Sequence, residues 1–283
     1  MITELVRTSD GVSVGLHRLD AGASGPAILL LHGAFSGHTV WLRGTGRRDT
    51  GGFASLLRER GFDIWLADLR DHGSSDREPA PRSWWFEDWI DRDAPALLAR
   101  SRDRVGARPL GLIGHSAGGT GGLGALARGG AHAPMDAMVA IGTPGPRHMG
   151  PVRFLGAWGF RAIARSLGRF PARALKFGGD DEGANVFGQW MSWNVRGRWL
   201  SRDGFDYLEA LTRVATPYLG VAGARDLLFS PPYACRQIVD GIGSSTKDFY
   251  IAPTLNHPGL VLDPRAADTV VPRVAEWLHA VLG

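Results

Sequence analysis

The chain has a single cysteine and almost no lysine. Cys235 is the one cysteine among 283 residues, which excludes an internal disulfide and a cluster of thiolate metal ligands. Lysine occurs only at Lys176 and Lys247, so arginine supplies nearly all of the positive charge. The formal net charge is only +4 although the pI is near 9.7. We interpret this balance as compositional bias, and no nucleic-acid partner is expected.

Long apolar runs are missing as well. No stretch approaches the roughly 18 apolar residues of a membrane span, and Met1–Arg7 lacks the apolar core of a secretory signal. The simplest expectation is a cytoplasmic protein. Spacings typical of metal ligands, such as His-Glu-x-x-His, are absent from the sequence. The sequence therefore predicts neither a metal site nor a cofactor.

Short apolar runs alternate with helical patterns over most of the chain. Runs at 27–31 and 62–67 are typical of buried parallel strands, and apolar residues recur between them at helical spacing. An amphipathic helix is expected over 86–105 and another from about 264 to 282. Further strands are expected at 109–113, 135–141, 217–222 and 248–251. The alternation predicts an α/β fold, with a mostly parallel sheet covered by helices on both faces and a hairpin at the sheet edge formed by 4–7 and 12–16.

Residues 146–213 interrupt this alternation. They are rich in arginine and tryptophan and helical in pattern, so we predict a helical lid inserted into a core made of 1–145 and 214–283. Residues 137–179, most of which belong to the insertion, contain no acidic residue. They contain seven basic residues: Arg147, Arg153, Arg161, Arg165, Arg169, Arg173 and Lys176. One interpretation is contact with an anionic membrane or lipid interface. The other is an ordinary solvated helix face.

The segment Gly114-His115-Ser116-Ala117-Gly118 follows an expected strand and precedes a run of small residues. A strand, a sharp turn and a helix in that order hold a serine on an exposed, strained bend, as a nucleophile requires. Glycine on either side relieves crowding at such a turn, and the Ala117 backbone N–H is available to a developing oxyanion. The pattern predicts acyl-transfer chemistry at Ser116.

A serine hydroxyl needs an imidazole to accept its proton, and the imidazole needs a carboxylate to fix its tautomer. Asp226 follows one expected strand and His257 follows the last one, at the sheet end where parallel strands gather functional groups. Both residues are therefore candidates beside Ser116. The alternatives are a loop-capping aspartate and a solvated loop histidine. Three other histidines are expected to be structural parts of their turns: His32, His72 and His115.

Four blocks of sequence resemble the serine hydrolases of the α/β-hydrolase superfamily. They are LLLHGAFSG, DIWLADLRDHGSSD, LGLIGHSAGG, and GARD together with NHPGLVL. The first three, with WWFEDWIDRDAPALL, are most similar to lipase-like and acid-lipase-like members. The related polyester synthases carry cysteine at the position that corresponds to Ser116, so the serine argues against that group. The resemblance runs from about residue 10 to the C-terminus outside the insertion.

This resemblance implies a cofactor-independent hydrolase of the lipase and esterase type, which cleaves a carboxylic ester of a small-molecule acyl substrate through an acyl-enzyme. It implies Ser116 as the nucleophile, His257 as the general base and Asp226 as its orienting acid. The implied oxyanion hole consists of the backbone N–H groups of Ala34 and Ala117, with Phe35 as the alternative to Ala34.

Other functions stay open at this point. The same groups serve hydrolysis of a lactone, thioester, amide or carbon–carbon bond, and a non-catalytic binding protein on the same fold is a further alternative. Residues 119–124 formally match a dinucleotide fingerprint, but the acidic residue expected after the next strand is missing. The sequence does not indicate an oligomeric state.

Five aromatic residues of the insertion are expected either to line an acyl pocket or to form the insertion's own core: Trp158, Phe187, Trp190, Trp193 and Trp199.

Overall fold

The computed structural model describes the chain except residues 21, 46–50 and 147–150, and describes the backbone alone at 131 and 151–154. Strands of one sheet lie in the order β1-β2-β4-β3-β5-β6-β9-β10, and all neighbours from β4 to β10 are parallel. The first two strands are antiparallel to their neighbours at the sheet edge, as expected for the hairpin. The bounds are β1 (Ile2–Arg7), β2 (Ser13–Arg18), β3 (Ala27–Leu31), β4 (Asp63–Asp68), β5 (Leu110–His115), β6 (Ala137–Ile141), β9 (Tyr218–Gly223) and β10 (Lys247–Ala252).

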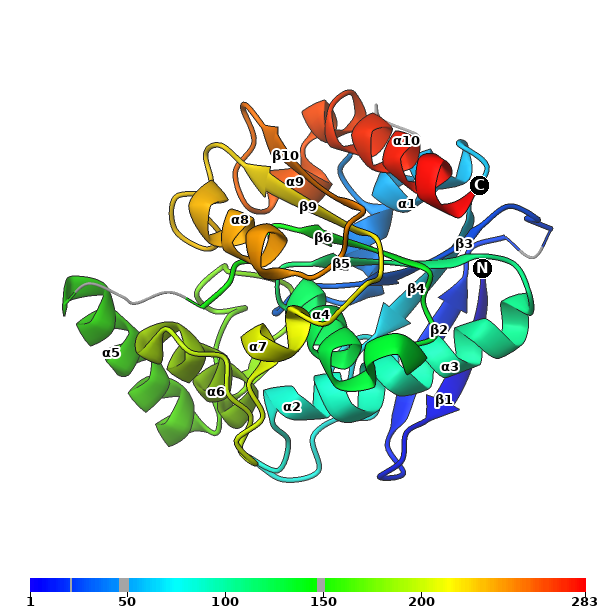
Figure 1. Cartoon of the computed structure of the whole chain (residues 1–283). Coiled ribbons are helices and arrows are strands. Elements are labelled where there is room, and N and C mark those ends of the chain that lie inside the picture. The colour runs from blue at the N-terminus through cyan, green and yellow to red at the C-terminus, as the bar shows by residue number, and fades with distance from the viewer. Residues whose placement is uncertain (21, 46–50, 147–150) are drawn as a thin grey trace.

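Helices cover both faces of this sheet (Figure 1). The central strand β3 is buried throughout, and its side chains alternate between two apolar clusters: Ile28 and Leu30 belong to one, Leu29 and Leu31 to the other. The first cluster includes side chains of α1 (Gly52–Arg58), α9 (Gly259–Leu262) and α10 (Val270–Leu282). The second includes side chains of α3 (Ala94–Val105), α4 (Ala117–Gly129), α7 (Tyr207–Leu211) and α8 (Pro232–Gly241). The predicted α/β fold with a mostly parallel sheet is confirmed.

Two expected helices are interrupted. The stretch 86–105 divides into α2 (Phe86–Asp88), a π turn η2 (Trp89–Asp93) and α3. At this turn the Ala94 N–H donates to the Trp89 carbonyl, and Pro95, which has no N–H, follows in the first turn of α3. The C-terminal stretch begins with a 3-10 turn η4 (Pro264–Ala267), and α10 starts only after Thr269, whose φ of −124° is not helical.

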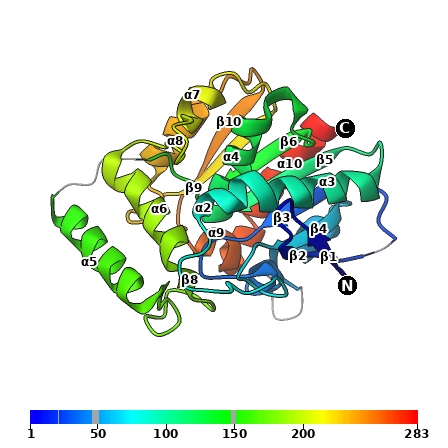
Figure 2. The ribbon, with the colours of Figure 1, turned by 90° about the horizontal axis from the view of Figure 1, so that it is seen from below.

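The insertion between β6 and β9 contains α5 (Pro151–Leu167), a short antiparallel pair β7 (Arg169–Phe170) and β8 (Glu182–Gly183), and α6 (Ala184–Arg196). Seen from below, α5 lies on the outside and α6 between it and the body of the sheet (Figure 2). A small apolar cluster joins these elements and includes Phe170 and Phe187. Trp193, Trp199 and Tyr207 instead belong to a core cluster, so the C-terminal part of the insertion packs on the core.

Within the described part of the chain, no helix has both the length and the apolar character needed to cross a membrane.

Candidate active site

Ser116 lies on a strained turn between β5 and α4. Its backbone has φ 53° and ψ −120°, a region that residues with a side chain rarely adopt. The turn is also crowded: a Cβ at Gly114 would lie 2.4 Å from the Gly119 Cα, and one at Gly118 would lie 2.2 Å from the His32 carbonyl oxygen. Glycine is therefore required at both positions, as the sequence pattern indicates.

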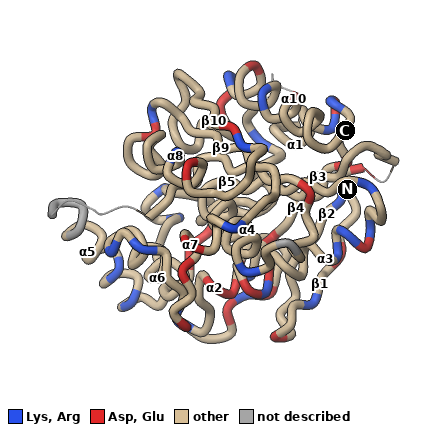
Figure 3. Tube along the Cα trace, in the orientation of Figure 1, with Lys and Arg blue, Asp and Glu red and all other residues tan. Residues whose placement is uncertain are grey.

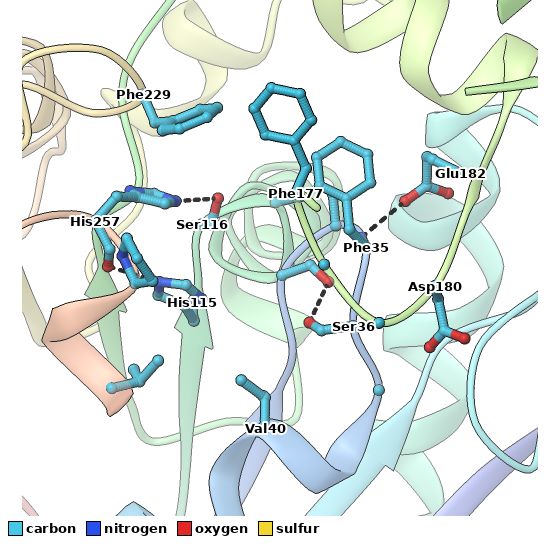
Figure 4. A pocket seen from close by; sticks show the side chains of 18 of the residues that line it. Phe35, Ser36, Val40, His115, Ser116, Phe177, Asp180, Glu182, Phe229 and His257 are labelled. Carbon is cyan, nitrogen blue, oxygen red and sulfur yellow. Dashed lines mark hydrogen bonds between the residues drawn. The ribbon is translucent and has the colours of Figure 1, made fainter. Parts of the chain in front are cut away.

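The structure brings Ser116, His257 and Asp226 together. The Ser116 Oγ lies 2.9 Å from the His257 Nε2 (Figure 4), and the His257 Nδ1 lies 2.6 Å from the Asp226 Oδ2. Asp226 follows β9 and His257 follows β10, so adjacent parallel strands deliver both groups to the same sheet edge. Burial raises the pKa of the Asp226 carboxyl, but its hydrogen bonds and its attraction to His257 outweigh burial and lower that pKa to about 2.

Ser230 completes the surroundings of this carboxylate, and the sequence analysis did not identify it. Its hydroxyl donates to the Asp226 Oδ2 and lies 2.8 Å from the His257 Nδ1. The backbone N–H groups of Phe229 and Ser230 each donate to the Asp226 Oδ1 at 3.0 Å. An aspartate at the start of a loop often accepts hydrogen bonds from backbone N–H groups a few residues later. That pattern in the sequence could have indicated that the serine four positions after Asp226 lies close to its carboxylate.

The residues proposed to supply the oxyanion hole line one cavity together with Ser116. The Ser116 N–H is already used, since it donates to the Ile141 carbonyl at 2.8 Å. Ala117 is the first residue of α4, where a helix leaves its N–H groups without intrahelical partners. On the facing loop, Phe35 has φ 63° and its N–H is directed at the Glu182 Oε2, 3.4 Å away.

Glu182 is a second residue that sequence reasoning missed. It comes from β8 of the insertion, is 1% exposed, and lies 3.5 Å from the His72 Nε2. Burial lowers the pKa of His72, but the charge of Glu182 outweighs it and raises that pKa to about 9. His72 thus ties the insertion to the core loop that follows β4. No spacing pattern relates these two positions in the sequence.

His32 and His115 are buried and neutral, consistent with structural roles. Burial lowers the pKa of each to about 3. The His32 Nδ1 donates to the Gly33 carbonyl at 2.8 Å and its Nε2 accepts from the Leu69 N–H at 3.1 Å. The His115 Nε2 lies 3.4 Å from the His257 carbonyl oxygen. These rings connect the loops that carry the candidate residues.

A cavity of about 620 Å³ opens beside Ser116 and His257 and is mostly apolar (Figure 4). Of the five aromatic residues singled out in the sequence, Phe187 and Trp190 line it. An adjoining apolar cavity of about 230 Å³ shares both of these side chains with it. Trp158 is 52% exposed. The aromatic set therefore divides between the cavity, the core and the surface.

Arginine lines a separate cavity of about 410 Å³ between α5 and α6, and Figure 3 shows basic positions along both helices. Five arginines contribute to it: Arg161, Arg165, Arg196, Arg198 and Arg202. Of these, Arg202 forms an ion pair with Glu87 at 3.0 Å. Arg147, named in the sequence analysis, lies outside the described residues, as does the side chain of Arg153.

Comparison with known proteins gives one consistent picture. Human "Lipase member K" is 28% identical over 129 residues, which cover 41% of this chain and 32% of that protein. Bovine "Gastric triacylglycerol lipase" is 26% identical over 129 residues, which again cover 41% of this chain and 32% of that protein. The matched part thus spans about a third of the length of these curated relatives. A thermophilic esterase from Thermogutta terrifontis is 18% identical, with each chain covered over 100% of its length and a TM-score of 0.67.

The sequence model of the alpha/beta hydrolase fold family matches residues 26–177. This range holds the loop with Ala34 and the turn with Ser116. Since the match covers more than half of the chain, the family is established, and the resemblance to lipases and esterases of that superfamily is confirmed. The chain belongs to the alpha/beta hydrolase fold family.

Proposed function

We propose that this protein is a serine hydrolase that cleaves carboxylic esters. The observation that carries the proposal is the continuous series of contacts from the Ser116 Oγ through His257 to Asp226, at 2.9 and 2.6 Å. His257 takes the proton of Ser116 as the oxygen attacks the ester carbonyl, and Asp226 orients the imidazole. The tetrahedral intermediate collapses to an acyl-enzyme and releases the alcohol, which receives that proton. A water molecule activated by His257 then releases the acid.

The backbone N–H groups of Ala117 and Ala34 stabilise the oxyanion in this scheme. Ala117 is supported by its place at the start of α4, where the helix dipole favours negative charge. Ala34 is favoured over Phe35 because the Phe35 N–H is directed at Glu182. Ala34, Ala117 and Ser116 all line the same cavity.

An apolar acyl group is the substrate feature that the cavity supports best. Phe35, Phe187, Trp190 and Phe229 line the cavity beside Ser116 and also its apolar extension. Burying an apolar chain there is favourable by about 0.8 kcal/mol for each CH₂ group removed from water. We therefore expect a p-nitrophenyl ester of a medium-length acid to be hydrolysed faster than the acetate.

Labelling with a fluorophosphonate probe tests the proposal directly. We expect one probe molecule to attach per chain and Ser116→Ala to abolish both labelling and esterase activity. The matched control is Ser166→Ala, which removes an exposed hydroxyl of α5 and should leave both unchanged. If the folded protein resists labelling and cleaves no ester in a series of graded acyl length, a binding protein on the same fold becomes the better assignment.

A lipid interface is the partner that α5 supports. Its apolar side chains are unusually exposed: Leu155 at 70%, Ile163 at 45% and Leu167 at 63%. Arg161 and Arg165 belong to the same helix, where they line the cavity between α5 and α6. An amphipathic helix with basic and apolar residues binds at the surface of an anionic membrane. We propose that α5 contacts such a surface and that the insertion acts as a lid between it and the cavity.

A further inference from the structure

Four polar side chains converge beside the antiparallel strand β2, apart from the residues assigned to ester hydrolysis. His17 lies in β2, His38 begins the 3-10 helix η1 (His38–Leu42), Asp68 ends β4, and Ser74 lies in the loop that follows. His17 is 2% exposed and Asp68 is fully buried. The side chain of His38 is 14% exposed, which leaves a path from solvent.

The polar atoms of this group are spaced like the ligands of one small cation. The Asp68 Oδ2 lies 3.0 Å from the His17 Nε2, 2.9 Å from the His38 Nδ1 and 3.1 Å from the Ser74 Oγ. The Ser74 Oγ lies 3.3 Å from the His17 Nε2. In tetrahedral zinc sites, bonds of about 2.0–2.1 Å place the ligand atoms about 3.3 Å apart. The ligand atoms of His17, His38 and Asp68 all lie within 4.8 Å of one another, and the rings of His17 and His38, whose centroids are 4.0 Å apart, would have to separate by about 1 Å to bind one tetrahedral ion.

We propose that His17, His38 and Asp68 bind a Zn²⁺ ion, with the Ser74 hydroxyl at the fourth position. Two imidazoles and one carboxylate form a donor set that suits zinc among the metals of the first transition row. The sequence spacing predicts no such site because the ligands come from separate segments. Among the described residues, this is the group of three or more histidine, cysteine and carboxylate side chains whose ligand atoms lie within 4.8 Å of one another.

Neighbouring groups already orient the ligands. The Thr3 Oγ1 lies 2.8 Å from the His17 Nδ1, so the ring can bind zinc through Nε2 while its proton moves to Nδ1 and is donated to the Thr3 oxygen. The backbone N–H groups of His38 and Ser74 each donate to Asp68 at 2.8 Å. Partners of this kind fix ring orientation and raise ligand affinity in metal sites.

A glycine keeps the space between the ligands open. A Cβ at Gly15 would lie 2.1 Å from the Ser74 Oγ, 3.1 Å from the His17 Nε2 and 3.3 Å from the Asp68 Cβ. A larger residue at this position of β2 would displace the ligand atoms. The bound ion would join β2 and β4 to η1, which begins four residues after Ala34. We therefore assign the ion a stabilising role, with no part in the chemistry at Ser116.

Metal titration of the chelator-treated full chain tests this inference. We expect one Zn²⁺ per chain, a melting temperature that rises with Zn²⁺ concentration, and a Co²⁺ absorption spectrum of four-coordinate intensity. His38→Gln should weaken binding at least about tenfold and remove the Co²⁺ spectrum. Thr3→Val, which alters an exposed residue outside the ligand set, should weaken binding while the spectrum is kept.

Two control variants separate this site from other histidines. His132→Gln changes an exposed histidine, and His257→Gln removes the imidazole of the proposed active site; both should bind one Co²⁺ with an unchanged spectrum. The inference is overturned if no stoichiometric ion binds. It is equally overturned if His38→Gln, shown by circular dichroism to be folded, binds as tightly as the original chain. Neither result bears on esterase activity, which is measured separately.

Discussion

At the scale of single residues, the proposed role of Asp226 is to orient His257 rather than to take part in the bond changes. Its Oδ2 accepts from the His257 Nδ1 at 2.6 Å, which leaves the Nε2 facing Ser116 as an acceptor. Ser230 and two backbone N–H groups hold the carboxylate in place. The carboxylate thereby selects one tautomer of the ring.

Replacing Asp226 by asparagine should therefore damage turnover far more than folding. The amide can present an N–H to His257, which favours the wrong tautomer, and we expect kcat to fall on the order of 10⁴-fold. Steady-state hydrolysis of a p-nitrophenyl ester measures this. Asp240→Asn, an exposed change on α8, is the matched control. Near-normal turnover in Asp226→Asn would show that another group orients His257.

The same carboxylate links stability to pH. Its pKa falls from the ordinary 3.8 to about 2 on folding, so it stabilises the folded state above about pH 4 and loses this contribution as pH falls towards 2. The contribution is about 2 kcal/mol. Urea unfolding between pH 6 and pH 3 should show the free energy of unfolding declining more steeply in the original chain than in Asp226→Asn. Parallel declines would contradict the assignment.

At the scale of elements, the sequence predicted strands better than long helices. The strand β3 occupies the predicted residues because a fully buried strand is a short apolar run bounded by turns. The stretch 86–105 is helical as predicted, but it divides at a π turn just before Pro95. The spacing of apolar residues cannot predict this division, because it does not show that Pro95 leaves a backbone carbonyl without its N–H partner. Glu182 was beyond prediction, because its partners Phe35 and His72 are distant in sequence.

Glu182 provides a test of how β8 supports the loop with Ala34. Glu182→Gln keeps the shape of the side chain but removes the charge that faces His72, and we expect kcat to fall about tenfold with a smaller change in KM. Steady-state kinetics measures both values. Glu209→Gln, whose side chain is 71% exposed on α7, is the control. An unchanged kcat would mean that the loop holds its position without the insertion.

At the scale of the whole molecule, chain order was enough to anticipate which residues meet at the candidate active site. In a parallel sheet the carboxyl ends of β5, β9 and β10 share one edge, so Ser116, Asp226 and His257 converge once the strand order is right. No such rule predicts that His17, His38, Asp68 and Ser74 meet. This group joins the antiparallel strand β2 and the end of β4 to a loop and a 3-10 helix, and no sequence period relates these elements.

The uneven charge of the molecule gives the last prediction. Because α5 carries exposed apolar side chains together with Arg161 and Arg165, the protein should co-sediment with vesicles of anionic phospholipid at low salt and be released at high salt. Each basic residue near such a surface contributes about 1 kcal/mol. Arg161→Gln with Arg165→Gln should therefore weaken binding at least about tenfold.

The control for this experiment removes the same charge elsewhere. Arg213 follows α7 and Arg236 lies on α8, with side chains 67% and 53% exposed, and replacing both by glutamine should leave vesicle binding unchanged. Because net charge is then equal in the two double variants, a difference between them measures position rather than overall electrostatics. Equal weakening in both would assign the attraction to the net charge of the chain, and salt-resistant binding to neutral vesicles would assign it to apolar contact alone.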